Sequence, residues 1–137
     1  MNDNRVERAV ELHKKGYNCA QCVACAYCDL VGLDEKTAFR MAEGFGAGMG
    51  DFQDTCGALT GAILIGGLST DGSGIQGPKT KQETYKKVKE LKKKFTEMNG
   101  SSLCHELKGM GGGTLLRSCE GCIKDGAVLA GEFLNAK

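Results

Sequence analysis

The apolar residues of this chain recur every three or four positions, which is the spacing of one face of an α-helix. The clearest case runs from Thr80 or Lys81 to Met98, where one face carries an apolar stripe of Tyr85, Val88, Leu91, Phe95 and Met98. No segment alternates convincingly with a period of two, so the pattern predicts no β-strand. We therefore expect an all-α fold.

Capping and helix-breaking residues set the expected bounds of the other helices. Asn18 and Asp34 are typical N-caps, and Gly16 and Gly32 are typical helix ends. The expected helices are one around Val6 to Lys15, one from Asn18 to Val31, one over Glu35 to Glu43, one from after Asp54 to about Leu68, a short one capped by Ser101 or Ser102, and a last one from about Ser118 to Leu134.

Two glycine-rich segments interrupt this helical pattern. Glycine stands at every second position from 44 to 50, and a second glycine loop spans 109–113. Each glycine costs about 1 kcal/mol in a helix relative to alanine, so these segments should be loops. The whole pattern predicts a compact bundle of about six or seven helices with glycine-rich connections, forming a single domain over residues 1–137.

Charge and hydropathy exclude several classes of partner. The net charge is +1, so no strong field would recruit nucleic acid or a membrane surface. The most apolar stretch, Ala58 to Leu68, is far shorter than the roughly 20 residues of a membrane span. The chain begins with charged residues and lacks the apolar run of a secretion signal. We therefore expect a cytoplasmic protein that contacts neither nucleic acid nor membrane.

Eight cysteines in 137 residues require a chemical reason. In a reducing cytoplasm, grouped cysteines indicate metal or redox chemistry more often than disulfides. Four of them form the run Cys19, Cys22, Cys25 and Cys28. On a helix, each step of three residues rotates the side chain by about 60° relative to the last, so a straight helix cannot aim all four sulfurs at one metal. Adjacent pairs can converge, and a bent or locally unwound helix could offer three. Cys22, Cys25 and Cys28 are individually typical of small buried side chains.

Cys56 is the sharper candidate, because it lies at the expected start of a helix and after a glycine-rich loop. Free amides and the helix dipole stabilise a thiolate there, so we expect Cys56 to be the most acidic of the candidate site cysteines. Exposed loop amides are also good partners for anionic sulfur. The candidate cofactor-binding glycines are Gly46, Gly48, Gly50 and Gly57. Near the last helix, Cys119 and Cys122 form a C-x-x-C pair.

The lysine-rich segment 79–94 has two interpretations. The simpler one is the solvated face of an amphipathic helix. The functional alternative is a docking surface for an acidic redox partner.

Five ordered segments together resemble the redox-active family C_GCAxxG_C_C. They are Gly16-Tyr-Asn-Cys-Ala-Gln21, Gly44-Phe-Gly-x-Gly-Met-Gly50, Thr55-Cys-Gly-Ala-Leu-Thr-Gly61, Cys104 with Glu106-Leu-x-Gly109, and Cys119. The resemblance covers nearly the whole chain and implies four signature cysteines: Cys19, Cys56, Cys104 and Cys119. Residues 56–58 read Cys-Gly-Ala, whereas the family label reads Gly-Cys-Ala. Cys22, Cys25, Cys28 and Cys122 lie outside the signature. A similar domain occurs in split-Soret-type cytochromes, which carry an iron–sulfur centre, so the resemblance favours a cluster here.

Three functions follow as hypotheses. The first is electron transfer by an iron–sulfur cluster, with [2Fe–2S] favoured, whose metal ligands are Cys19, Cys56, Cys104 and Cys119. The second is a thiol/disulfide oxidoreductase with Cys56 as catalytic nucleophile and Cys19 or Cys119 as resolving thiol. The third is a structural zinc module. The cofactor alternatives are therefore zinc or none, and oxidoreductase activity stays open. The expected partner is an unidentified redox protein, with a homodimer as an open alternative.

Overall fold

The structure is a computed structural model that describes residues 4–69, 75 and 79–135. Its α-helices are α1 (Arg5–Lys14), α2 (Cys19–Tyr27), α3 (Glu35–Ala42), α4 (Gly57–Leu68), α5 (Lys81–Asn99), α6 (Cys104–Leu107) and α7 (Cys119–Asn135). Three shorter helical turns are η1 (Cys28–Val31), η2 (Glu43–Phe45) and η3 (Gly48–Phe52). The described residues form no β-strand. Thr55 and Leu103 form an isolated antiparallel β-bridge. The predicted all-α fold is confirmed.

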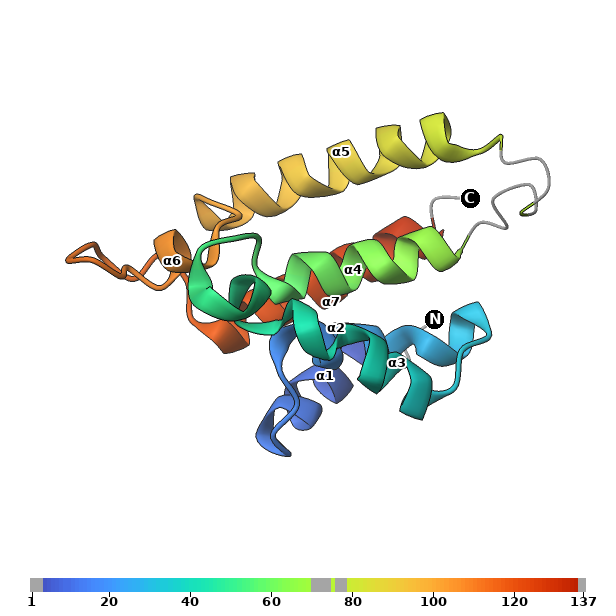
Figure 1. The fold of residues 1–137 in the computed structure, drawn as a ribbon, viewed down its shortest axis with the longest axis horizontal. Coiled ribbons are helices and arrows are strands. Elements are labelled where there is room, and N and C mark those ends of the chain that lie inside the picture. The colour runs from blue at the N-terminus through green and yellow to red at the C-terminus, as the bar shows by residue number, and fades with distance from the viewer. Residues whose placement is uncertain (1–3, 70–74, 76–78, 136–137) are drawn as a thin grey trace.

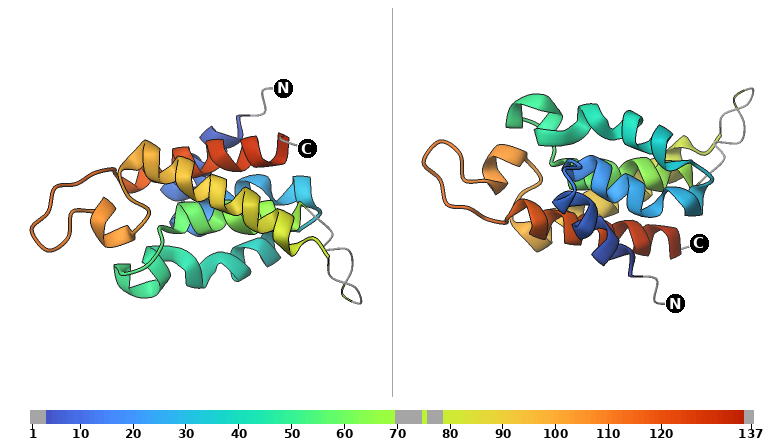
Figure 2. Two further views of the ribbon diagram at one scale, coloured as in Figure 1. Left: turned by 90° about the horizontal axis from the view of Figure 1, so that it is seen from above. Right: turned by 90° about the horizontal axis from the view of Figure 1, so that it is seen from below.

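Helices α2, α4 and α7 pack against one another at the centre of the molecule. Helix α1 packs on α2 and α7, α3 packs on α2, and α5 lies along α4 and α7 (Figures 1 and 2). Helix α6 and the connection to α7 project at one end of the bundle (Figure 2). The three central helices begin near that end, which positions their N-termini together.

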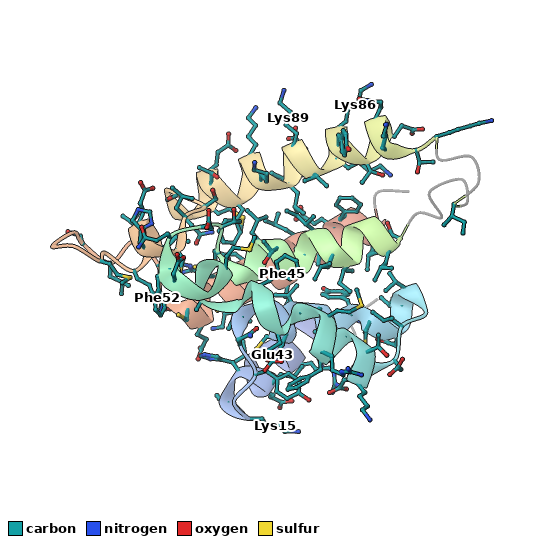
Figure 3. All side chains as sticks on the ribbon, in the orientation of Figure 1. Lys15, Glu43, Phe45, Phe52, Lys86 and Lys89 are labelled. Carbon is teal, nitrogen blue, oxygen red and sulfur yellow. The ribbon has the colours of Figure 1, made fainter. Side chains whose placement is uncertain are left out.

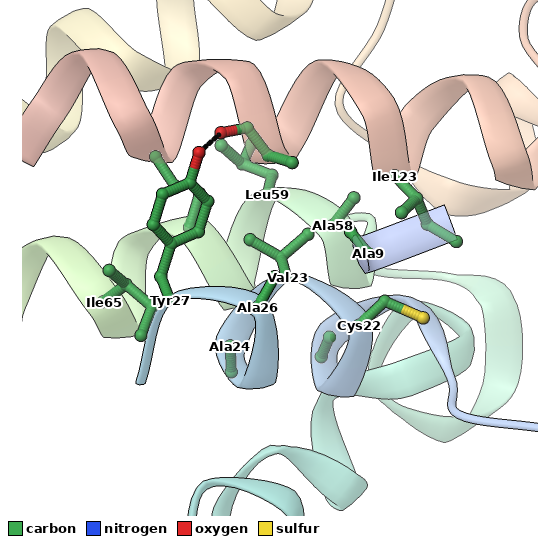
Figure 4. Packing of buried hydrophobic residues seen from close by; sticks show 14 of the residues in the cluster. Ala9, Cys22, Val23, Ala24, Ala26, Tyr27, Ala58, Leu59, Ile65 and Ile123 are labelled. Atoms are coloured by element: carbon green, nitrogen blue, oxygen red, sulfur yellow. Dashed lines mark hydrogen bonds between the residues drawn. The ribbon is translucent and has the colours of Figure 1, made fainter. Parts of the chain in front are cut away.

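The core between these helices is built from small and branched apolar side chains (Figure 4). Val23 of α2, Leu59 of α4 and Ile123 of α7 are each fully buried. The hydroxyl of Tyr27 donates a hydrogen bond of 2.8 Å to the backbone oxygen of Ala127 and thereby joins α2 to α7. A buried hydroxyl needs such a partner, so this bond fixes the two helices in register.

Two glycines allow the central helices to approach very closely. A Cβ on Gly61 would lie 2.7 Å from the backbone oxygen of Ala20, and one on Gly126 would lie 2.6 Å from that of Ala58. Gly57 and Gly61 leave one face of α4 without side chains, and α2 occupies that face. The helices that carry or follow Cys19, Cys56 and Cys119 thus pack together, because α2, α4 and α7 contact one another.

Part of the apolar stripe on α5 is exposed, contrary to the sequence pattern. Leu91 and Phe95 are buried, but Tyr85 is 60% exposed and Met98 is 47% exposed. Because α5 lies on one side of the bundle against α4 and α7, the middle of the stripe is covered and its ends are not. Its lysines Lys86 and Lys89 point away from the bundle (Figure 3).

Two expected helix boundaries also differ. The N-cap of α6 is Leu103, whereas the hydroxyl of Ser101 accepts the Leu103 N–H at 3.0 Å and so shapes the turn before the helix. Helix α2 ends at Tyr27, and η1 continues to Val31. Residues 69–78, where Gly, Ser, Asp and Pro in the sequence also predict a loop, fall mostly outside the described residues. Among the helices described, none is both long and apolar enough to cross a bilayer.

Candidate functional site

A cavity of about 190 Å³ lies at the end of the bundle where the central helices begin. Five of the eight cysteines line it: Cys19, Cys56, Cys104, Cys119 and Cys122. The structure thus brings the four signature cysteines together although they lie up to 100 residues apart in the chain. It also adds Cys122, which the signature does not contain.

Three of these cysteines lie where a helix begins. Cys19 is the first residue of α2, Cys119 is the first residue of α7, and Cys56 is the N-cap of α4. The first amides of a helix have no intrahelical acceptor, and the helix dipole is positive at that end. Three such ends around one cavity favour negatively charged sulfur there.

Local hydrogen bonds hold the first residues of α2 and α7 in place. The Asn18 side chain accepts the Gln21 N–H at 2.9 Å, and the Gln21 side chain accepts the Asn18 N–H at 2.9 Å. This reciprocal capping box fixes the backbone on either side of Cys19. The Ser118 hydroxyl accepts the Gly121 N–H at 3.0 Å, which caps α7 directly before Cys119.

Backbone pairing places Cys56 beside Cys104. The Cys56 N–H donates to the Ser102 oxygen at 2.8 Å, and the Cys104 N–H donates to the Asp54 oxygen at 2.9 Å. Between these two bonds lies the bridge of Thr55 with Leu103. The segment entering α4 is therefore joined to the segment entering α6, which explains why two cysteines 48 residues apart reach the same cavity.

Four of the cavity thiols form two hydrogen-bonded pairs. Cys19 donates to Cys119, and Cys122 donates to Cys56. The donated bond and burial raise the pKa of Cys19 and of Cys122, so these two keep their protons. The bond from Cys122 lowers the pKa of Cys56, and the amides of Ala58 and Leu59 add to that effect. Each pair therefore combines a protonated thiol with a sulfur that favours the thiolate.

A hydrogen bond from Cys19 is the largest cause of the low pKa of Cys119, and Lys108 adds to it. The Lys108 Nζ donates a hydrogen bond of 3.0 Å to the Cys119 sulfur. The bond from Cys19, together with the bond and charge of Lys108, lowers the pKa of Cys119 to about 5. The pKa of Cys56 is lowered as well, in the expected direction. That Cys56 is the most acidic signature cysteine stays a prediction.

The candidate cofactor glycines occupy different environments. Gly48 and Gly57 line the cavity, and a Cβ on Gly48 would lie 2.5 Å from the Cβ of Cys104. Gly46 instead packs against the Asn18 side chain, and a Cβ on Gly50 would meet nothing within 4 Å. The structure therefore places two of the four glycines at the site. A cofactor contact by any of them stays a prediction.

The set of candidate site residues predicted from the sequence left out two residues of the cavity, Cys122 and Lys108. The C-x-x-C spacing had marked Cys122, which lies three residues after Cys119 and shares a face of α7 with it, but the family signature did not include it. Lys108 carried no such signal, because nothing in a sequence of many lysines marks the one that reaches a sulfur of another helix. The cavity also borders His13, Tyr17, Phe52 and Arg117.

The donor set of the cavity fits a thiolate-bound group. Five thiols line the cavity, and two of them favour the thiolate form, which is the form that binds metal. Thiolates are the ligands that zinc and iron–sulfur clusters select. Among the residues described, no three His, Cys, Asp or Glu side chains are grouped as a site for one metal ion.

Comparison with known proteins agrees with the signature. The chain matches the model of the family described as "Putative redox-active protein (C_GCAxxG_C_C)" over residues 17–133. It is 35% identical over 108 residues to an uncharacterized protein of Archaeoglobus fulgidus, an alignment that covers 73% of this chain and 71% of the relative. No solved structure matches the chain.

Proposed function

The chain belongs to the redox-active family C_GCAxxG_C_C, and on this premise we propose that it is an electron-transfer protein with a cysteine-ligated iron–sulfur cluster. The observation that carries the proposal is the convergence of five thiols and three helix N-termini on one cavity. The proposed ligands are the signature cysteines Cys19, Cys56, Cys104 and Cys119. When bound, such a cluster would accept and donate single electrons.

The protein's own groups have defined tasks in this proposal. Lowered pKa values at Cys119 and Cys56 mean that two ligands lose their protons readily, because hydrogen bonds already stabilise their thiolates. Burial raises the pKa of Cys104, so its proton would leave only when a metal replaces it. The helix N-termini and Lys108 compensate the negative charge that four thiolates would bring into the cavity.

The [2Fe–2S] type is supported by the pairing of the thiols. Each iron of such a cluster takes two protein ligands, and the proposed ligands lie as two neighbouring pairs: Cys19 contacts Cys119, and backbone pairing places Cys56 beside Cys104. Five thiols exceed the four places by one. We assign Cys122 as the hydrogen-bond donor to Cys56, because it lies outside the family signature and keeps its proton.

A thiol/disulfide oxidoreductase is the second candidate, and a specific contact favours it. Cys119 is partly exposed, favours the thiolate and accepts a hydrogen bond from Cys19. Cys119 would attack a substrate disulfide, and Cys19 would then displace the bound thiol and close an intramolecular disulfide. The contacts support Cys119 over Cys56 as the nucleophile, because Cys56 is buried and is paired with Cys122.

A structural zinc module has less support. Zinc requires four ligands around one ion, and no three candidate ligands of the described residues converge in that way.

A reducing cytoplasm is part of the main proposal, since the thiols must stay reduced to bind iron. A redox partner protein would deliver or remove the electron, and the exposed lysines of α5 are the proposed contact for an acidic one.

Anaerobic purification tests the proposal. We expect iron and acid-labile sulfide in roughly equal amounts, visible absorption that bleaches on reduction, and loss of both in Cys56→Ser and Cys104→Ser. Cys122→Ser should keep the cluster. A metal-free protein that cycles between a dithiol and a Cys19–Cys119 disulfide would contradict the cluster and favour the thiol/disulfide oxidoreductase. Stoichiometric zinc without iron would favour the third.

A further inference from the structure

Lys108 reaches the site from outside the thiol set. It follows α6, where its N–H donates to the Cys104 oxygen at 3.0 Å, and its Nζ extends to the Cys119 sulfur of α7 at 3.0 Å. It is therefore the side chain that joins the two helices carrying the last two signature cysteines. Its pKa is raised by the bond to Cys119, so the ammonium keeps its charge.

The ring of Phe52 also contacts this ammonium. The Lys108 Nζ lies 5.5 Å from the centroid of the Phe52 ring, within the range of a cation–π contact. Phe52 has φ +66°, a left-handed conformation that is rare for a bulky residue and costs energy. It ends η3, in which Met49 is also left-handed. Figure 3 shows Phe52 at the α6 end of the molecule.

The charge of Lys108 is directed at sulfur rather than at a carboxylate. Arg117 also borders the cavity, but its guanidinium is paired with Asp125 at 3.2 Å. Within the described part of the chain, no carboxylate lies at salt-bridge distance from Lys108. A lysine held between an aromatic ring and a thiolate thus supplies the site with positive charge that no acidic side chain cancels.

We propose that Lys108 sets the reduction potential of the cavity's redox centre through its hydrogen bond to the Cys119 sulfur, and that Phe52 is the positioning residue that holds the ammonium. This inference rests on the redox function proposed above. Reduction adds negative charge to the centre, whether one electron enters a cluster or a disulfide becomes thiolates. A fixed cation at the sulfur stabilises the reduced form more than the oxidised form and therefore raises the potential.

The test compares reduction potentials of the purified protein and matched variants. Lys108→Met should reduce the equilibrium constant for reduction by about tenfold or more, which is a fall of about 59 mV for a one-electron centre or about 30 mV for a dithiol. Lys108→Arg should restore most of the potential, because it returns a charged N–H donor. Phe52→Leu should give a smaller fall in the same direction.

Lys124→Met is the control for net charge, because the exposed Lys124 on α7 pairs with Glu120 instead of a thiol. It should leave the potential nearly unchanged. The iron content and circular dichroism of each variant show whether the centre and the fold are retained. An unchanged potential in Lys108→Met with retained centre overturns this proposal alone. A wild-type protein with no redox-active centre overturns the proposed function and this inference together.

Discussion

Two groups of cysteines in this molecule differ in the direction in which the pKa of the thiol is shifted. Cys56 and Cys119 line the cavity at the starts of α4 and α7. Cys22 and Cys25 lie inside α2, where their neighbours are other core residues. Hydrogen bonds to sulfur lower the pKa of each member of the first pair, whereas burial raises the pKa of Cys22 and of Cys25 to about 12.

Cys22, Cys25 and Cys28 behave as small hydrophobic residues whose S–H group is a weak hydrogen-bond donor. Cys22 donates to the Tyr17 oxygen at 3.5 Å, Cys25 to the Glu35 oxygen at 3.8 Å, and Cys28 to the Cys25 oxygen at 3.5 Å. These thiols use their protons to satisfy backbone oxygens, which keeps them neutral. The comparison teaches that the contacts of each sulfur decide the role of a cysteine here: the sulfurs of Cys56 and Cys119 accept hydrogen bonds, whereas those of Cys22 and Cys25 donate to backbone oxygens.

The strongest test of this division is loss of the redox centre. Cys56→Ser should abolish iron retention, or disulfide cycling if no metal binds, because it removes a sulfur that already favours the ligating form. Helix content should stay nearly unchanged. Cys22→Ser is the matched control and should retain the centre. If the Cys56 variant keeps its full metal content and full redox cycling, Cys56 is only a packing residue.

Thiol alkylation of the reduced, metal-free protein measures the difference directly. At about pH 7 Cys119 is above its pKa of about 5 and ionised, whereas Cys22 is far below its raised pKa of about 12 and protonated. Because thiolate is the reactive form, although its intrinsic reactivity falls as its pKa falls, Cys119 should react about 10²-fold faster. Its rate should fall as the pH decreases through about 5. Peptide mass spectrometry after a short exposure to iodoacetamide reads both sites, and equal rates would remove the distinction.

We expect the close packing of the helices to hold both groups of cysteines in place. A substitution at Gly126, where α7 packs against α4, tests this expectation. Gly126→Ala would place a Cβ 2.6 Å from the Ala58 oxygen and force α7 away from α4. We expect a loss of about 1–3 kcal/mol in the free energy of unfolding. Gly67→Ala is the control, because a Cβ there meets nothing within 4 Å, and it should stabilise α4 by up to about 1 kcal/mol. Urea denaturation measures both changes, and similar values would contradict the close packing.

The smallest effect is expected at Cys28. It is buried at the end of α2, and it does not line the cavity. Cys28→Ala should lower stability by about 1 kcal/mol through lost packing and leave the redox titration intact. Thermal unfolding combined with a redox titration reads the two quantities separately. Complete loss of iron in this variant would mean that the cysteine run belongs to the site.

Local signals accounted for most of the helices. The Asn18 side chain caps α2 as predicted, and Gly32 with φ +75° closes the turn after it. Predictions failed where the outcome depends on a distant partner. Tyr85 belongs to a regular apolar stripe, yet its side chain is 60% exposed, because an apolar spacing along one helix does not fix which of its residues a neighbouring helix covers. Ser101 is a good capping residue by type, yet pairing between segments 54–56 and 102–104 moved the helix start to Cys104.

The sequence by itself determined the helical class and the starts of α2 and α3, whose caps Asn18 and Asp34 are local. These properties depend on spacing and capping within a few residues, which the chain order contains. The family resemblance of the sequence separated the signature cysteines from Cys22, Cys25 and Cys28. The tertiary structure alone decided that Cys122 pairs with Cys56 and that Lys108 contacts Cys119. Hydrogen bonds between sulfurs and a cation act over a few ångströms, and only the packing of α4, α6 and α7 brings those atoms within that range.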